Sequence, residues 1–397
     1  MLVSMGDEPI LDGEFCQRRH EWFDRMRVES PVCPVRLPNG QRVWLATRYD
    51  DARALLAHPA LSKDSRRATP LYEKIAREEG VRRTFISKLL RDHMLNLDPP
   101  DHTRLRRLVG AAFTLRRVEL LRPRLEEIVS ELLSGLSGEV DLVEDYAFPV
   151  VGTMAGELFG VPVPERDRFR SMSQSITQGA SPEAVGQAFA VMADYLTDLV
   201  ARKRSAPGDD LVSALVQARD VDDRLDEDEL VSMVFLLLTA GFETTVHLIG
   251  NGVVTLLQHP ASLAELRADP SLLPRAIEEL LRFEGPAGTA TLRFTLEPVS
   301  VGGVTIPAEE FVLVPLGAAN RDGARFPSPH SFDITREAAG HIAFGHGIHH
   351  CLGAPLARLT GQIAIGALVA RDVELVSVSD WRNNPLFRSY ERIVVRV

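Results

Sequence analysis

Cysteine is scarce in this sequence of 397 residues, and the three that occur, Cys16, Cys33 and Cys351, follow no regular spacing. So small and odd a set excludes a disulfide framework and is typical of a reducing compartment. The N-terminal stretch MLVSMGDEPILDGEF also lacks an apolar segment behind a positive start, so it indicates neither a signal peptide nor a membrane anchor. We therefore expect a cytoplasmic protein.

Positive charge is in deficit as well. The chain has 45 Lys and Arg residues against 55 Asp and Glu residues, a formal net charge of −10 at pH 7. A surface this acidic argues against nucleic acid as a general partner. Low-complexity segments, internal repeats and linker-like stretches are absent from the sequence too. We expect a single domain over residues 1–397 and a monomer.

One apolar segment, Leu230 to Gln258, is long enough to cross a bilayer at about 20 residues per span. Its middle, however, carries a polar stripe of Glu243, His247 and Asn251, spaced four residues apart. A charged side chain there would cost roughly 2.5 to 3.5 kcal/mol on insertion. We interpret the segment as a long helix through the centre of a soluble protein, and we expect no membrane partner.

The rest of the chain is mainly helical in its periodicity, with strand-like runs near both ends. The 3.6-residue period predicts helices over Val118–Leu136, Glu165–Thr177, Pro182–Arg204 and Pro274–Phe283. A further helix follows DPPDH, with Asp98 as its cap. Short β-branched runs over residues 41–48, 289–317 and 386–397 predict small sheets. The predicted fold class is therefore mainly α with small β-sheets, an α+β fold.

The stretch HIAFGHGIHHCLGAPLAR, residues 341–358, places four histidines and Cys351 within eleven residues, before a helical run. Such histidines are often plain surface-loop residues. A zinc site is a second hypothesis, although the paired spacings typical of zinc are missing. A nucleophilic Cys351 with His350 as base is a third, and it is weaker because adjacent side chains rarely point at each other.

A fourth hypothesis explains more of the residues. Gly345, Gly347 and Gly353 let the backbone turn tightly and approach a large flat group. Cys351 precedes a helix whose N-terminal dipole and free N–H groups favour a thiolate over a thiol. A single thiolate in a glycine-rich loop suits an axial ligand of haem iron.

Three motifs then resemble one family. The spacing Phe-x-x-Gly-x-x-x-Cys-x-Gly, from Phe344 to Gly353, is similar to the haem-binding loop of the cytochrome P450 monooxygenases. The stretch AGFETT, residues 240–245, resembles the family's oxygen-activation sequence, and Glu279 and Arg282 match its Glu-x-x-Arg motif. The motifs stand in the expected order, and nearly the whole chain resembles soluble bacterial members that tailor polyketides and related secondary metabolites.

The resemblance implies the cytochrome P450 fold, with haem b between two helices, and a role for each matching residue. Cys351 would ligate the iron, and Glu243 and Thr244 would steer protons to O2. Glu279 and Arg282 would support the haem loop structurally, while His341, His346 and His350 keep a surface role. The propionate-binding residues would be His102, Arg106, Arg293 and His349, and the other residues around the haem would be Phe344, Gly345, Gly353 and Ala240.

The implied reaction inserts one oxygen atom from O2 into a C–H bond of an apolar small molecule, by hydroxylation or epoxidation. A haem-thiolate protein that binds or senses a ligand without oxygenation is the alternative, against which Glu243 and Thr244 argue. The family resemblance assigns the substrate pocket to a set of mainly apolar residues, a type that is more often plain core. They are Phe85, Ile86, Leu89, Met94, Leu95, Leu237, Ala240, Thr289 and Phe387.

Electrons must come from other proteins, because the sequence has no flavin or nicotinamide fingerprint and no cysteine cluster for iron and sulfur. A ferredoxin with its ferredoxin reductase is the expected donor system. The basic run RLRRLVGAAFTLRR, with Arg104, Arg107, Arg116 and Arg117, is the predicted docking site for an acidic ferredoxin.

Overall fold

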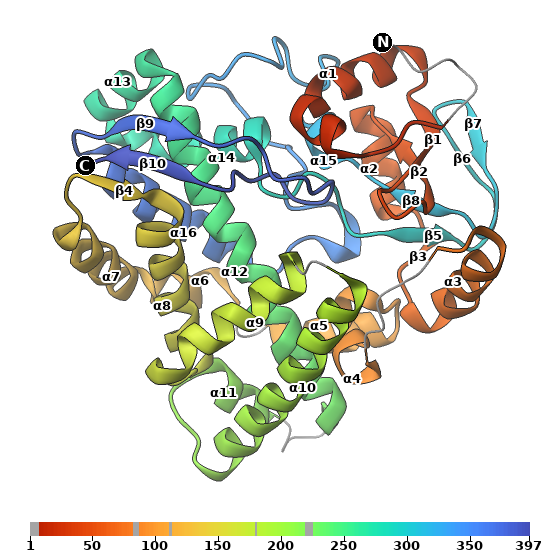
Figure 1. Cartoon of the computed structure of the whole chain (residues 1–397), viewed down its shortest axis with the longest axis horizontal. Helices are drawn as coiled ribbons and strands as arrows, with labels where there is room; N and C mark the ends of the chain where they lie inside the picture. Colours follow the sequence, from red (N-terminus) through yellow and green to blue (C-terminus); the bar gives the residue numbers. More distant parts are fainter. Residues whose placement is uncertain (1–7, 82–86, 111–112, 179–180, 219–224) are drawn as a thin grey trace.

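The structure is a computed structural model, and it describes residues 8–81, 87–110, 113–178, 181–218 and 225–397. Helices fill most of it, and three small sheets lie at the margins (Figure 1). The predicted class, mainly α with small β-sheets, is confirmed.

The helices differ widely in length, and α12 is the longest of those described. They are α1 (Gly13–Glu29), α2 (Tyr49–Ala57), α3 (Ser65–Glu79), α4 (Lys88–Arg91), α5 (Asp101–Gly110), α6 (Leu115–Glu119), α7 (Arg122–Gly135), α8 (Phe148–Phe159), α9 (Arg166–Gln178), α10 (Pro182–Ser205), α11 (Leu211–Ala218), α12 (Glu227–Gln258), α13 (Pro260–Ala268), α14 (Leu273–Glu284), α15 (Leu316–Ala319) and α16 (Ala354–Val369). Short 3-10 turns occupy Met94–Asn96, Val163–Glu165, Pro270–Leu272 and Gly347–His349, and a π-helical turn occupies Leu142–Ala147.

The sheets join strands that lie far apart in the sequence. The largest has the order β1-β2-β8-β5-β3, in which β2 and β8 are parallel and the other pairs are antiparallel. A second has the order β4-β10-β9, and β6 and β7 form a hairpin. The strands are β1 (Val32–Arg36), β2 (Arg42–Ala46), β3 (Leu61–Ser62), β4 (Glu139–Asp141), β5 (Arg293–Thr295), β6 (Val299–Val301), β7 (Val304–Ile306), β8 (Phe311–Leu313), β9 (Glu374–Val378) and β10 (Ile393–Arg396).

The long helix α12 runs through the middle of the molecule (Figure 1). It starts with a capping box, in which the Asp226 side chain accepts from the Glu229 N–H at 2.7 Å and the Glu229 side chain accepts from the Asp226 N–H at 3.0 Å. Beyond that turn it is apolar on nearly every side and mostly buried, as expected of a core helix. Its length and composition would suit a membrane span, but its surface is covered by protein.

Two apolar clusters meet along α12. Residues from Leu230 to Leu238 pack with α10 and α11 in one cluster, and residues from Phe242 to Leu256 pack with α7, α8, α14 and α16 in the other. Between the two clusters, Ala240 and Gly241 are exposed, although they lie in the middle of a core helix. The candidate site lies at this break.

Two sequence-based expectations were wrong in detail. The predicted helix over Val118–Leu136 is two helices, α6 and α7, because Pro123 in the first turn of α7 cannot continue a hydrogen-bonded helix behind it. The Asp98 carboxylate does not cap α5, since Pro99 and Pro100 after it bring no N–H. It accepts instead from Ser62 Oγ at 2.5 Å and from the Lys63 N–H at 3.0 Å.

Candidate active site

The cysteine lies at the end of a tight loop that leads into α16. Gly345 and Gly347 have φ values of +74° and +76°, which L side chains rarely adopt. A Cβ on Gly347 would also come within 3.0 Å of the Leu56 carbonyl oxygen. Across the loop, the Cys351 N–H donates to the Phe344 carbonyl at 2.9 Å. The loop therefore presents Cys351 in one fixed backbone conformation, one turn before α16.

Two opposing effects set the pKa of the Cys351 thiol. Burial raises its pKa, while the N–H groups of Gly353 and Ala354 and the guanidinium groups of Arg106 and Arg358 lower it. Burial wins, so the pKa lies above the ordinary value of a cysteine. The N–H groups at the start of α16 favour the thiolate, as expected, but desolvation outweighs them. A cation bound to sulfur would reverse the balance, since a coordinating thiol is deprotonated.

Positive side chains gather beside the cysteine loop. Lys63 and Arg293 are 5% and 4% exposed, and both bond to Thr291: Lys63 Nζ donates to its hydroxyl, and Arg293 Nη1 donates to its carbonyl at 3.0 Å. Burial lowers the pKa of Arg293 to about 10 and that of Lys63 well below its usual range. Among the described residues, Asp98 is the carboxylate that raises the pKa of both Lys63 and Arg293. Its oxygens already accept hydrogen bonds from Ser62 Oγ and the Lys63 N–H.

Two histidines complete this group. The rings of His102 and His349 lie 4.5 Å apart, and neither ring nitrogen of the buried His102 has a hydrogen-bond partner. Burial and nearby cations lower the pKa of both histidines. Arg106, one turn along α5 from His102, donates to the His350 carbonyl at 2.8 Å and so ties α5 to the loop.

We name the cations Lys63 and Arg293, together with the neutral imidazoles of His102 and His349 beside them, the cation cluster. Buried cations with too few counter-charges favour an anion, and carboxylates suit them well. This donor set fits the two propionates of haem. The free thiol of Cys351 beside it fits the haem iron. Lys63 was missed at the sequence level because a lone lysine has no motif. Pairing of β3 with β5, with Ser62 opposite Phe294, brings it next to Arg293.

The middle of α12 places the predicted proton-handling residues. Glu243 is 4% exposed, and Thr244 is half-buried. Thr244 Oγ1 donates to the Ala240 carbonyl at 2.9 Å, and Thr245 Oγ1 donates to the Gly241 carbonyl at 2.7 Å. Leu352, next to Cys351, packs against the apolar cluster that contains Leu236 and Leu238 of α12. The cysteine loop and the middle of α12 are thus linked through one apolar cluster.

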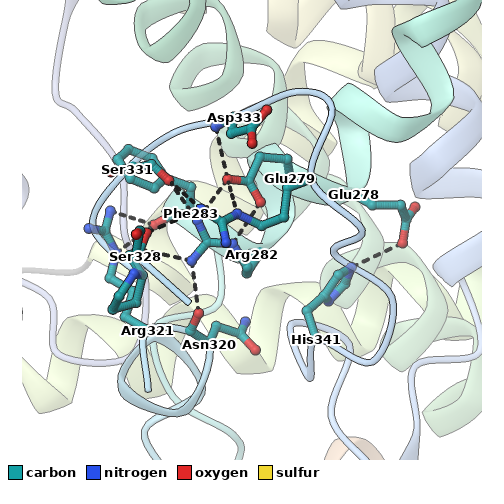
Figure 2. A network of polar contacts seen from close by, with 12 residues as sticks. Glu278, Glu279, Arg282, Phe283, Asn320, Arg321, Ser328, Ser331, Asp333 and His341 are labelled. Carbon is teal, nitrogen blue, oxygen red and sulfur yellow. Dashed lines mark hydrogen bonds and ion pairs between the residues drawn. The ribbon is translucent and has the colours of Figure 1, made fainter. Parts of the chain in front are cut away.

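Glu279 and Arg282 form a buried pair under the loop (Figure 2). The guanidinium and the carboxylate make two hydrogen bonds, at 2.6 and 2.7 Å, and both side chains are 0% exposed. Arg282 also donates to the Asn320 carbonyl at 3.0 Å, and the Asn320 side chain accepts from the Ile342 N–H at 2.8 Å. The pair therefore holds the start of the cysteine loop through Asn320.

The predicted pocket residues fall into two places. Leu89, Met94, Leu95 and Leu237 share the apolar cluster on the N-terminal half of α12. Phe387 and Thr289 belong to a different region, near the C-terminal half, where Ala287 bridges to Phe387. Phe85 and Ile86 lie outside the described residues.

The other histidines of the loop make ordinary contacts. His341 Nε2 lies 3.0 Å from Glu278 Oε2, and His346 Nε2 accepts from Arg53 Nε at 3.3 Å. In the part of the chain that the structure describes, no three His, Cys, Asp or Glu side chains come together to hold a metal ion. The structure therefore offers no support for the zinc hypothesis.

Glu278 supplies a test of how the loop is held. Burial alone would raise the pKa of Glu278, but hydrogen bonds from His341 and Arg358 hold this pKa at about 2. A depressed carboxyl pKa stabilises the fold above the ordinary value of 4.5 and stops doing so as pH falls through about 2. We expect Glu278→Gln to cost up to about 3 kcal/mol at pH 7. Urea unfolding should show this difference shrinking from pH 4.5 towards 2, and a pH-independent difference would contradict the assignment.

Comparison with known proteins agrees with this geometry. Residues 169–371 match the family described as Cytochrome P450. The chain is 52% identical to cytochrome P450 107B1 of Saccharopolyspora erythraea, over 99% of each chain. It is 45% identical to the 6-deoxyerythronolide B hydroxylase of the same organism, over 94% of this chain and 95% of the other. The solved structure of the tirandamycin C-bound P450 monooxygenase TamI superposes with a TM-score of 0.91 at 44% identity, covering 98% of this chain and 99% of that one.

Proposed function

Because the chain belongs to the cytochrome P450 family and is a monooxygenase, we propose that it inserts one oxygen atom from O2 into a C–H bond of an apolar polyketide or related secondary metabolite. The observation that supports this proposal is the cation cluster beside the free Cys351. The exposed residues Ala240 and Gly241 interrupt the buried surface of α12. Hydroxylation is the proposed outcome, with epoxidation as a second outcome of the same chemistry.

The residues of the site fit haem b. The cation cluster and Arg106 would hold the propionates, and Cys351 Sγ would ligate the iron. When bound, haem supplies the O2 chemistry, and a thiolate ligand favours cleavage of the O–O bond. The exposed Ala240 and Gly241 would leave room on α12 for a small ligand.

Glu243 and Thr244 are the proposed route for protons. A buried carboxyl in an apolar helix is typical of a functional group. The Thr244 hydroxyl lies one residue from it on the half-buried side of α12, and its hydrogen bond to the Ala240 carbonyl fixes its rotamer. The hydroxyl hydrogen is engaged by that carbonyl, while the oxygen can still accept a hydrogen bond. A proton relay through Thr244 would therefore begin with rotation of the hydroxyl away from Ala240.

Thr244→Ala is expected to uncouple electron use from product, lowering product per electron by roughly tenfold, since positioned proton transfer contributes at least that much. Thr245→Ala is the matched control, because its hydroxyl makes the same bond to a carbonyl four residues back and is 8% exposed. Product and reductant consumed are measured in the same reaction. Equal coupling in the two variants would remove the role of Thr244.

The substrate class rests on the relatives and on the apolar pocket residues. A hydroxylase of 6-deoxyerythronolide B and a monooxygenase bound to tirandamycin C are both close in sequence. The cluster of Leu89, Met94, Leu95 and Leu237 would cover an apolar substrate, as in most small-molecule sites. We further propose a cytoplasmic monomer. The one long apolar helix among the described residues is mostly buried inside the protein, which supports a core helix over a membrane span.

Ferredoxin and its reductase are the proposed electron donors, and α6 is the proposed docking site. Arg116 and Arg117 are exposed there beside Leu115 and Leu120, which are 72% and 73% exposed. The helix packs against α16, which begins after Cys351. Exposed apolar groups among cations are typical of a protein contact. Arg104 was predicted to be part of the docking site, but we exclude it here, because its guanidinium pairs with Glu229 of α12 and its side chain is only 29% exposed.

Reversing both charges, Arg116→Glu with Arg117→Glu, is expected to slow reduction by ferredoxin roughly tenfold at low salt and to flatten its salt dependence. Arg77→Glu is the control, since Arg77 is exposed on α3, at the far side of the view from α6 (Figure 1). Reduction by dithionite should not change in either variant. An unchanged ferredoxin rate would exclude α6 as the docking site.

The proposed function is tested by two measurements on the purified protein. The absorption spectrum of the reduced, carbon monoxide-bound form reports haem with a thiolate ligand. Product formation with a ferredoxin system, followed by mass spectrometry on macrolactone and linear polyketide candidates, reports oxygenation. A thiolate spectrum without any oxygenated product would favour the ligand-binding alternative.

A further inference from the structure

His247 lies on the face of α12 that carries the site. It stands three residues after Thr244 and seven after Ala240, so the three side chains leave the helix on one side. The side chain is 9% exposed, and its Nδ1 has no hydrogen-bond partner. Its ring lies 6.2 Å from the ring of Phe387, between centroids.

Thr289 reaches the same place from another segment. It is 7% exposed, and its Oγ1 has no hydrogen-bond partner. The N–H groups of Gly288 and Thr289 donate to the Leu386 carbonyl at 2.8 and 3.3 Å, and Ala287 bridges to Phe387. Thr289 and His247 therefore both adjoin the chain at residues 386 and 387.

These open hydrogen-bonding positions differ from their surroundings. The threonines of α12, residues 239, 244, 245 and 255, all donate to the carbonyl four residues earlier. Asn251, one turn beyond His247, donates to the carbonyls of Glu284 and Arg388 at 3.2 and 2.8 Å. A buried polar group without a partner costs about 1 to 3 kcal/mol, so two such atoms on residues that adjoin the same segment favour a ligand that satisfies them.

The segment that carries Phe387 is held rigidly. Arg19, 2% exposed in α1, donates to the carbonyls of Asn384 and Phe387 at 2.9 and 3.3 Å. A Cβ on Gly288 would come within 2.0 Å of Arg19 Nη1, so only glycine lets this guanidinium pass. Arg388 Nη1 donates to the Cys16 carbonyl at 2.7 Å, a second tie to α1. Groups placed on such a support lose little freedom when a ligand binds.

We propose that His247 Nδ1 and Thr289 Oγ1 form a polar anchor that hydrogen-bonds a neutral hydroxyl or carbonyl oxygen of the substrate. The inference rests on the proposed function and narrows its substrate class to apolar molecules that carry such an oxygen away from the oxidised carbon. Burial lowers the pKa of His247 to about 4, so the imidazole is neutral at pH 7. A neutral imidazole and a hydroxyl can each donate or accept, which suits an uncharged oxygen.

The test uses 1-alkylimidazoles as probes, because their ring nitrogen binds haem iron directly and does not depend on the natural substrate. Plain chains of six to twelve carbons are compared with the same chains that end in a hydroxyl. The dissociation constant of each is measured by spectral titration of the haem-loaded enzyme. We expect the hydroxyl to improve affinity, relative to the plain chain, by roughly five- to tenfold at one chain length, the value of about one good hydrogen bond.

Thr289→Val and His247→Leu should each remove this length-specific preference, measured within each variant as the ratio of the dissociation constants of the plain and the hydroxyl-bearing chain. His247→Gln should keep part of it, since an amide still donates and accepts. Thr255→Val is the matched control and should keep all of it, because that hydroxyl is already bonded to the Asn251 carbonyl at 2.7 Å.

A preference that is absent at every length, or that survives in both the valine and the leucine variants, would overturn the anchor. This outcome leaves the proposed function standing, since the probes still report haem iron. A protein loaded with haem in which no probe shifts the spectrum would contradict the proposed function itself.

Discussion

Cys351→Ser is expected to abolish the haem-thiolate spectrum and to lower the rate of oxygenation by roughly a hundredfold or more. Changing a residue that only supports a metal ligand typically costs about 10- to 100-fold, and loss of the ligand itself should cost more. A serine hydroxyl would stay protonated, whereas the thiol would lose its proton to solvent when its sulfur binds a cation. Burial opposes this loss, and the N–H groups of Gly353 and Ala354 favour it. The measurement is the absorption spectrum of the reduced, carbon monoxide-bound protein, with product formation alongside.

The fold should survive this change, because serine is close to cysteine in size and the hydrogen bond from the N–H of residue 351 to the Phe344 carbonyl is kept. Thermal unfolding of the haem-free protein should move by no more than a few degrees. Cys33→Ser, at a half-buried position in β1, is the matched control and should keep the spectrum. Retention of the wild-type bands in Cys351→Ser would refute the assignment of the ligand.

Glu279→Gln is expected to destabilise the protein by about 3 kcal/mol or more, because it leaves the buried charge of Arg282 without its partner. The Asn320 contact that holds Ile342 depends on the same guanidinium, so the cysteine loop should loosen and haem should dissociate faster. Urea unfolding measures the first effect, and transfer of haem to an acceptor protein measures the second.

Glu119→Gln is the control for this experiment, with an expected change within about 0.5 kcal/mol. Glu119 and Arg122 have the same spacing and bond at 2.9 Å, but their side chains are 57% and 37% exposed. Equal effects of the two substitutions would show that the pair of Glu279 and Arg282 has no special structural role.

Much of the architecture could be predicted from local pattern. The central helix, α9, α10 and α14 lie within a few residues of their predicted bounds, because apolar periodicity reflects the face that a helix buries. The cysteine loop could be located because glycines at positive φ leave a mark in the sequence. Lys63 could not, because nothing local distinguishes it, and it joins Arg293 only through the pairing of β3 with β5.

Electrostatics was the least predictable part. The N–H groups at the start of α16 lower the pKa of Cys351, as the sequence indicated. Burial raises that pKa by more, and burial depends on every segment packed around the sulfur. Asp98 reads as a helix cap, but its partners are Ser62 and the Lys63 N–H, over thirty residues away. Arg104 reads as a free surface cation and pairs with Glu229 across α5 and α12.

The tetrapeptide ELLR occurs twice in the chain, at residues 119–122 and 279–282. The sequence by itself determined that Glu and Arg stand three residues apart in both copies, a spacing at which side chains on a helical turn can form an ion pair. Glu279 and Arg282 share α14, whereas the other pair spans the junction where α6 ends and α7 begins. Only the tertiary structure decided that one pair lies in solvent and the other is 0% exposed beneath the cysteine loop. The reason is physical: spacing along the chain sets which side chains meet, whereas desolvation depends on what the rest of the molecule packs over them.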